Sequence, residues 1–153
     1  MFGRQTECAI AAMSHLAEVY DDGQTRLSAN DIADARDLQR PSVAKCLAAL
    51  SQAGLVNGAP GPGGGFTLAR HPRSIKLIDV FRLFEREKDY AACPFGGGRC
   101  GVGKPCPLHE ELAAVHEAQR RLLHNTTFEK FRAAYQDSCP TSARRRPSSR
   151  RKR

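Results

Sequence analysis

A fourteen-residue segment in the second half of the chain sets the tightest limit on its fold. Residues 93–106, CPFGGGRCGVGKPC, contain five glycines, two prolines and three cysteines. Glycine and proline disfavour regular secondary structure, and the segment holds too few apolar side chains to build a core of its own. If this loop is ordered, something other than its own packing must organise it, and the folded parts of the chain lie on either side of it.

Apolar spacing predicts a helix over residues 5–20, ended by the turn residues 21–23. Two shorter helices follow. Ser28 and Asp31 form an acidic capping box at the start of the first, and Pro41 begins the second, which ends at Gly54. The side chains expected to face inward are Ile10, Met13, Leu16, Ala17 and Tyr20 of the long helix, and Ile32, Ala33, Val43, Leu47 and Leu50 of the short ones.

Two short helices joined by a tight turn are typical of a helix-turn-helix, although ordinary helical hairpins share the pattern. The next segment favours the first interpretation. The β-prone runs 55–56 and 66–68 flank NGAPGPGGG, which predicts a hairpin with a flexible tip, or wing, beside the second helix. This glycine run lacks the sequence context of a nucleotide-binding loop. The candidate DNA-binding residues are Ser28, Arg40, Pro41, Ser42 and Lys45, with Gly63, Gly64 and Gly65 letting the wing backbone approach a phosphate.

Three further helices are expected around the cysteine loop. Ser74 can cap a helix over 75–86, and Thr126 with Glu129 can cap a final helix. Between them, the helix 107–124 has a heptad-like seam, which favours a homodimer interface over packing within one subunit. The seam consists of Leu108, Leu112, Val115, Gln119 and Leu122, and the final helix has Phe128, Phe131 and Tyr135 as its apolar residues.

The charge distribution points to a polyanionic partner. The net charge is +8, and the last ten residues, 144–153, hold seven of the lysines and arginines. Residues 24–76 carry a second basic excess. Both are typical of a nucleic-acid-binding protein. The tail after Pro140 is expected to be disordered, adding only sequence-independent attraction to phosphates. No apolar run is long enough to span a membrane and no signal peptide is evident, so a cytoplasmic location is expected.

Three of the six cysteines form a candidate metal site. Cys93, Cys100 and Cys106 have the spacing C-x6-C-x5-C on the flexible loop, so their sulfurs can converge. The close cysteine pairs of structural zinc sites are missing, which favours an iron–sulfur cluster. His109, one turn further on, is a candidate fourth ligand, and Glu7 of the first helix, from the same or the partner subunit, is an alternative. The remaining cysteines, Cys8, Cys46 and Cys139, are not assigned to the site: the first two fit helical core positions.

These motifs resemble the IscR/NsrR/RirA group of bacterial winged-helix regulators that hold iron–sulfur clusters. The resemblance covers about residues 4–137 and is carried by LSANDIADARDLQRPSVAKCLAALSQAGLV, GPGGGFTLAR and the cysteine loop followed by PLHEEL. It implies a homodimer whose second short helix enters the major groove and whose wing touches the minor groove. His109 matches a ligand position that goes with a [2Fe-2S] cluster, which we favour, whereas Glu7 matches one that goes with [4Fe-4S]. Two departures are one extra residue before Cys100, and Pro60 where arginine often precedes the wing glycines.

The sequence therefore predicts a mainly α fold with a small β-hairpin: a winged helix-turn-helix plus a long dimerisation helix. The expected divisions are a DNA-binding domain over 1–86, a cluster-binding loop over 87–106, dimerisation and C-terminal helices over 107–138, and a disordered tail over 139–153. The expected function is a transcriptional regulator, most simply a repressor, controlled by a cluster that senses iron, oxygen or nitric oxide. The alternatives are a cluster-free thiol sensor of oxidants and a zinc-stabilised interaction module. An enzyme is not expected, because no nucleophile–base pair or cofactor fingerprint is evident.

Overall fold

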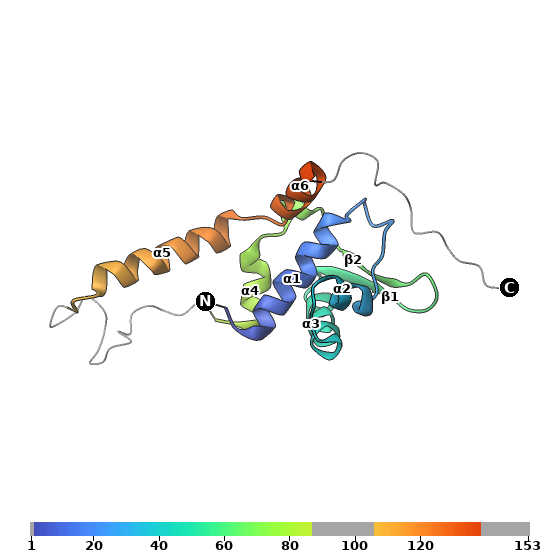
Figure 1. Ribbon diagram of the computed structural model, residues 1–153, viewed down its shortest axis with the longest axis horizontal. Helices are drawn as coiled ribbons and strands as arrows, with labels where there is room; N and C mark the ends of the chain where they lie inside the picture. The colour runs from blue at the N-terminus through green and yellow to red at the C-terminus, as the bar shows by residue number, and fades with distance from the viewer. Residues whose placement is uncertain (1, 87–105, 139–153) are drawn as a thin grey trace.

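The computed structural model describes residues 2–86 and 106–138. Within these ranges the chain is mainly helical with one two-stranded antiparallel hairpin, as the sequence predicts (Figure 1). None of the described helices is long and apolar enough to cross a membrane. The elements are α1 (Arg4–Glu18), α2 (Ala29–Ala35), α3 (Arg40–Gln52), β1 (Val56–Ala59), β2 (Gly65–Leu68), the 3-10 helix η1 (Pro72–Ser74), α4 (Leu77–Phe84), α5 (His109–Asn125) and α6 (Glu129–Ser138).

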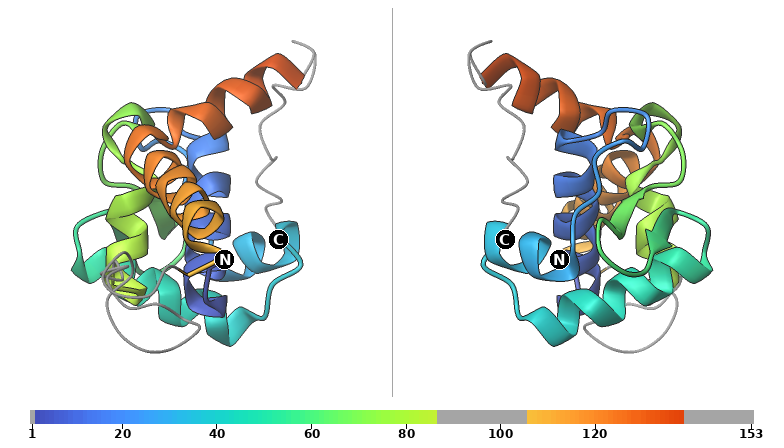
Figure 2. Two further views of the ribbon diagram at one scale, coloured as in Figure 1. Left: turned by 90° about the vertical axis from the view of Figure 1, so that its left-hand side faces the viewer. Right: turned by 90° about the vertical axis from the view of Figure 1, so that its right-hand side faces the viewer.

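Helix α1 lies at the centre of the fold and packs against α2, α3, α4 and α6. Figure 2 shows α3 and α6 near opposite ends of α1. Consistent with this, the Cys46 thiol on α3 lies 3.6 Å from the Gln5 carbonyl oxygen, and the Arg132 guanidinium on α6 lies over the Tyr20 ring. The predicted apolar face of α1 needs correction, because Ile10 and Tyr20 are only half-buried. Small residues replace them in the core, where they permit close helix packing: Cys8, Ala9 and Ala12.

The helix-turn-helix and the hairpin form as predicted. Ile32 and Ala33 of α2 are fully buried, as are Val43, Leu47 and Leu50 of α3. Gly54 has a φ of +71°, the left-handed conformation that glycine adopts after a helix. The strands pair from Val56 with Leu68 to Ala59 with Gly65, and Leu27 adds a single bridge to Phe66 of β2. The stretch before α2 is thereby fixed against the wing.

Helix α2 begins with the predicted capping box. The Ser28 hydroxyl accepts from the Asp31 backbone N–H, and the Asp31 carboxylate accepts from the Ser28 backbone N–H and hydroxyl. The hydrogen bond from the Ser28 hydroxyl, followed by that from its backbone N–H, lowers the pKa of the Asp31 carboxyl below its usual value. The hydrogen bonds that the Asp31 carboxylate accepts therefore stabilise α2 more when Asp31 is ionised than when it is protonated, whereas the bond from its backbone N–H to the Ser28 hydroxyl does not depend on ionisation.

We expect Ser28→Ala to lower the free energy of unfolding by about 1 kcal/mol at pH 7, because the helix loses its cap. The folded-state pKa of Asp31 is depressed, so its contribution is present above the unfolded value near 4 and is lost as the pH falls through the folded value. The difference in free energy of unfolding between the wild type and Ser28→Ala should therefore become smaller at acidic pH. Urea unfolding at several pH values measures it. Ser51→Ala, an exposed serine outside any cap, is the control, and an equal loss in both variants would contradict the assignment.

The start of α4 differs from the sequence prediction. Ser74 does not cap α4: it ends the 3-10 helix that Pro72 begins, and its hydroxyl donates to the His71 carbonyl oxygen. Helix α4 instead begins at Leu77, where the Asp79 carboxylate accepts from the Lys76 backbone N–H at 2.8 Å.

The C-terminal helices also start late. Helix α5 begins at His109 and α6 at Glu129, so Thr126 follows α5 rather than capping α6. The Thr126 carbonyl oxygen accepts from the Leu77 backbone N–H, and the Phe128 backbone N–H donates to Ile75, which ties the α5–α6 connection to the start of α4. Phe128 is fully buried, whereas Tyr135 is 44% exposed and lies outside the core.

Candidate nucleic-acid interface and cysteine site

The turn between α2 and α3 is built by local backbone geometry. Asp37 adopts a φ of +51°, and the Leu38 backbone N–H donates to the Ala33 carbonyl oxygen at 2.8 Å. The inner faces of both helices are buried against α1. This arrangement leaves the outer face of α3 in solvent, and its four predicted DNA-binding residues are all exposed: Arg40, Pro41, Ser42 and Lys45.

Arg40 has a partner that sequence reasoning did not assign. Its Nη2 lies 3.2 Å from each carboxylate oxygen of Asp34, near the end of α2. Both side chains are exposed, at 61% and 62%. The arginine that is a candidate for contacting DNA is therefore held beside a carboxylate in the free protein.

The three wing glycines occupy positions with different steric demands. A side chain at Gly64 would lie 2.2 Å from the Ala59 carbonyl oxygen, and one at Gly65 would lie 2.8 Å from the Leu27 carbonyl oxygen. Packing within the wing therefore accounts for both of these glycines. At Gly63 a Cβ would meet open space, and its φ of +75° favours glycine. Gly63 is thus the position of the three where the backbone can meet a ligand without obstruction.

Ser28 lies one residue from the bridge that joins Leu27 to Phe66, so it is close to the start of β2. Its hydroxyl is already bound to the Asp31 carboxylate at 2.7 Å. A phosphate that approached this hydroxyl would meet a carboxylate of the same charge. The geometry supports the capping role of Ser28, and its phosphate contact stays a prediction.

The cysteine site is only partly described by the structure. Cys93 and Cys100 lie outside the described residues. Cys106 is half-buried just before α5, and its carbonyl oxygen accepts from the His109 backbone N–H at 3.1 Å, so the two residues share one turn. Cysteine sulfur and histidine nitrogen are ligand types that iron–sulfur clusters accept. Among the described residues no three potential ligands gather at one point.

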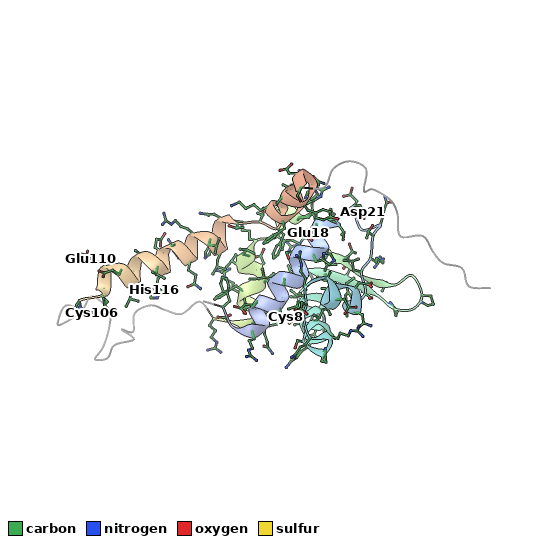
Figure 3. The ribbon with its side chains drawn as sticks, in the orientation of Figure 1. Cys8, Glu18, Asp21, Cys106, Glu110 and His116 are labelled. Atoms are coloured by element: carbon green, nitrogen blue, oxygen red, sulfur yellow. The ribbon has the colours of Figure 1, made fainter. Side chains whose placement is uncertain are left out.

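Glu7, the alternative ligand, is exposed on α1. Figure 3 shows Cys106 at the outer end of α5, well away from Cys8 on α1, the neighbour of Glu7 in the chain. Helix α5 leads away from the body on the side opposite the wing (Figure 1). Within one subunit this arrangement separates Glu7 from Cys106, so a site that uses both requires a second copy of the chain.

Cys8 and Cys46 behave as core residues, as predicted. Their exposed fractions are 5% and 2%. Burial, followed by the neighbouring Cys8 thiol, raises the pKa of the Cys46 thiol to about 12. A thiol with such a pKa stays protonated and reacts slowly with oxidants or alkylating agents at neutral pH. The core thiol Cys46 is therefore a poor candidate for a redox sensor.

We expect iodoacetamide at pH 7.5 to modify Cys106 in the folded protein and to leave Cys46 unmodified, because Cys106 is half-exposed whereas Cys46 is buried. Peptide mass spectrometry after a short exposure measures both sites. Labelling in urea, where both thiols are accessible, is the control. Equal labelling of the two cysteines without urea would contradict this prediction.

Sequence reasoning missed two polar contacts that join distant elements. The Glu85 carboxylate, just after α4, accepts from the Gly3 backbone N–H at 2.7 Å and from the hydroxyl of the buried Thr6. This fixes the start of α1 beside the residues that lead into the cysteine loop. Arg36 donates to Glu18 at 2.6 Å and ties α2 to α1. Sequence separations of 79 and 18 residues carry no periodic signal that predicts either contact.

Three of the five residues in the predicted seam of α5 are open to solvent, and the other two, Leu112 and Gln119, are half-buried. Leu108, Val115 and Leu122 are 45%, 59% and 40% exposed, and Leu123 is the buried residue of this helix. Helix α5 has seventeen residues and buries few of them, so packing within one subunit stabilises it little in water. The seam therefore has the features of a surface that packs against a partner.

Comparisons with known proteins agree with this geometry. A family model described as Rrf2, an iron-dependent transcriptional regulator, matches residues 2–134. The HTH-type transcriptional regulator BadM of Rhodopseudomonas palustris is 39% identical over 82 residues, 54% of this chain and 51% of BadM, so the match spans about half of that relative. The HTH-type transcriptional regulator IscR of Klebsiella pneumoniae is 28% identical over 119 residues, 78% of this chain and 71% of IscR.

Two solved structures have the same fold. CymR, described as the global cysteine regulator of B. subtilis, superposes with a TM-score of 0.69 at 22% identity, covering 88% of this chain and 97% of CymR. IscR of T. potens superposes with a TM-score of 0.67 at 23% identity, covering 92% of each chain. The described arrangement of helices and hairpin is thus one that other regulators share.

Proposed function

Because the chain belongs to the Rrf2 family of transcriptional regulators, we propose that it is a repressor whose operator binding is controlled by an iron–sulfur cluster. Regulators of this family bind DNA and are not enzymes. The observation that carries the proposal is the open outer face of α3 beside a glycine-built wing, in a chain whose Cys106 and His109 share one turn at the start of α5.

The DNA-binding surface is the proposed role of α3 and the wing. Helix α3 enters the major groove, where Arg40, Ser42 and Lys45 reach base edges and phosphates, and Pro41 sets the first turn. The wing follows the adjacent backbone, with Gly63 at its unobstructed position. Gly64 and Gly65 shape the wing, and Ser28, whose hydroxyl is bound to the Asp31 carboxylate in the free protein, is proposed as a further phosphate contact.

A second copy of the chain is the proposed partner of the α5 seam. Its apolar residues Leu108, Val115 and Leu122 are exposed in one protomer, and the helix extends away from the body, so pairing of two such helices would bury both seams. Helix-turn-helix dimers bind half-sites about one helical turn apart. Pairing through α5 would set the distance between the two α3 helices.

The cluster is proposed to bind Cys93, Cys100 and Cys106, with His109 as fourth ligand and [2Fe-2S] as the cluster type. Glu7 of a second copy is the alternative ligand, and it goes with [4Fe-4S]. When bound, the cluster supplies a group that oxygen, nitric oxide or iron shortage removes or alters. The chain's part is to hold the ligands at the start of α5, so that a change there acts on the helix that joins the two copies.

A cluster-free thiol sensor is the second candidate. The likeness in fold to CymR, which is described as a global cysteine regulator, supports it. In this function Cys106 would form a disulfide with another thiol when an oxidant takes two electrons.

One experiment tests the function and separates these candidates. The protein is purified without oxygen, its visible spectrum, iron and sulfide are measured, and operator sequences are selected from a random duplex library. A brown protein that selects a defined sequence, and changes its affinity when air removes the cluster, supports the proposal. A colourless protein whose affinity responds to hydrogen peroxide supports the thiol sensor. A protein that selects no sequence contradicts both candidates.

A further inference from the structure

We propose that Asp34 is a specificity-determining residue of the DNA-binding surface and that it acts through Arg40. The inference rests on the proposed function, because it concerns how α3 distinguishes an operator from random DNA. Asp34 belongs to α2 and makes no proposed contact with DNA itself. Its role would be to decide which kinds of acceptor Arg40 can bind.

The contact between Asp34 and Arg40 lies on the solvent-exposed side of the turn between α2 and α3. Arg40 Nη2 lies 3.2 Å from both carboxylate oxygens of Asp34, and the two side chains are 61% and 62% exposed. Exposed ion pairs contribute little to stability. Within the described part of the chain this contact engages Nη2 alone, so Nη1 and Nε keep their donors for single hydrogen bonds, and a bidentate contact with a base edge would also use the second hydrogen of Nη2.

Arg36, at the start of the same turn, forms a more buried ion pair with Glu18 that serves as a comparison. Its Nη2 lies 2.6 Å from Glu18 of α1, and the exposed fractions are only 28% and 16%. This contact joins α2 to the core. Helices α2 and α3 are joined to each other by their buried apolar faces, so a structural need does not account for the exposed pair.

The charge around the start of α3 explains what Asp34 would change. The first turn of α3 contains Arg40 and no acidic residue, and the positive end of the helix dipole lies there. Without Asp34 this turn would attract any DNA phosphate. With Asp34 in place, a phosphate that approaches Arg40 meets a like charge 3.2 Å from the guanidinium. The N7 and O6 atoms of guanine are uncharged acceptors, so this repulsion affects them much less.

The test is Asp34→Asn, which removes the charge and keeps the shape. We expect its affinity for a scrambled duplex to rise by up to about fivefold, the range of an exposed ion pair. The dependence of log affinity on log salt should steepen by about 0.9, the slope of one added phosphate contact. Affinity for the selected operator should change less than twofold, so the ratio of specific to random binding falls.

Two controls make the result specific to the pair. Asp37→Asn removes the same charge from the same turn, and asparagine tolerates the φ of +51° at that position. It should change binding to the operator and to the scrambled duplex equally. In an Arg40→Ala background, Asp34→Asn should no longer steepen the salt dependence for the scrambled duplex. Thermal unfolding of every variant verifies the fold, because a purely structural role would move the melting temperature and leave the binding ratio unchanged.

The outcomes separate this inference from the function on which it rests. If the wild-type protein selects no operator, the function fails and the inference fails with it. If the wild type selects an operator, but Asp34→Asn raises operator and random binding equally, only the role of Asp34 is overturned. The same holds if the salt effect survives in the Arg40→Ala background, because Asp34 would then act on DNA without Arg40.

Discussion

Replacing Val115 with aspartate is expected to turn the proposed dimer into monomers while each protomer keeps its fold. Val115 is 59% exposed in the single chain, the highest value among the exposed large apolar residues, so an aspartate there costs the protomer little. In a dimer joined through α5, the same side chain would be covered by the second copy. A buried carboxylate without a partner costs about 3–5 kcal/mol, which corresponds to a loss of dimer affinity of at least about a hundredfold.

Sedimentation equilibrium over a range of protein concentrations measures this change. Ala113→Asp is the matched control, because it adds the same charge to another exposed position of α5, about 200° around the helix from Val115. That variant should remain a dimer, and both variants should melt at similar temperatures as dilute monomers. A Val115→Asp protein that sediments as the wild-type dimer would show that α5 does not form the interface.

The parts of the fold that the sequence predicts best are those whose signals lie close together in the chain. The second short helix is an example, because Val43, Leu47 and Leu50 mark its buried face and Gly54 its end within twelve residues. The hairpin is another, since its glycine-rich tip lies between two β-prone runs. In both cases local propensity and the final packing agree.

The misplaced features depend on tertiary context. The largest side chains predict one face of α1, yet Ala9 and Ala12 occupy the core because four helices and the strand β2 pack around this helix. Ser74 is a residue type that often caps helices, but here it is the last residue of the 3-10 helix that begins at Pro72. The buried face of α1 and the start of α4 both depend on packing between distant elements, for which a single sequence has no local signal.

The candidate site shows the same division. Exposed residues on α3 were predicted from the helical pattern, because the buried positions leave only one open face. The sequence does not predict the pairing of Arg40 with Asp34, because their separation of six residues spans a turn and matches no helical repeat. The link between Glu85 and the start of α1 depends on a contact between elements 79 residues apart. Pairs of this kind follow only from the three-dimensional fold.

The second large effect is expected at the cysteine site, where Cys106→Ala should abolish the visible absorption of protein purified without oxygen. A cluster that loses one of its cysteine ligands no longer has the thiolates that hold its iron. Cys106 also stands just before α5, the helix of the proposed dimer interface. Iron and sulfide contents should fall together with the absorption.

Cys46→Ala is the matched control for this result, because Cys46 is buried in the core with its thiol protonated, and its removal should leave the spectrum unchanged. His109→Ala adds a finer distinction: if His109 is the fourth ligand, the spectrum shifts or the cluster is lost sooner in air, whereas Glu7→Ala leaves both unchanged. The reverse pattern would favour a site shared between two copies. A Cys106→Ala protein that keeps its full iron and sulfide content contradicts the ligand assignment, and α5 would then join the two copies without carrying the cluster.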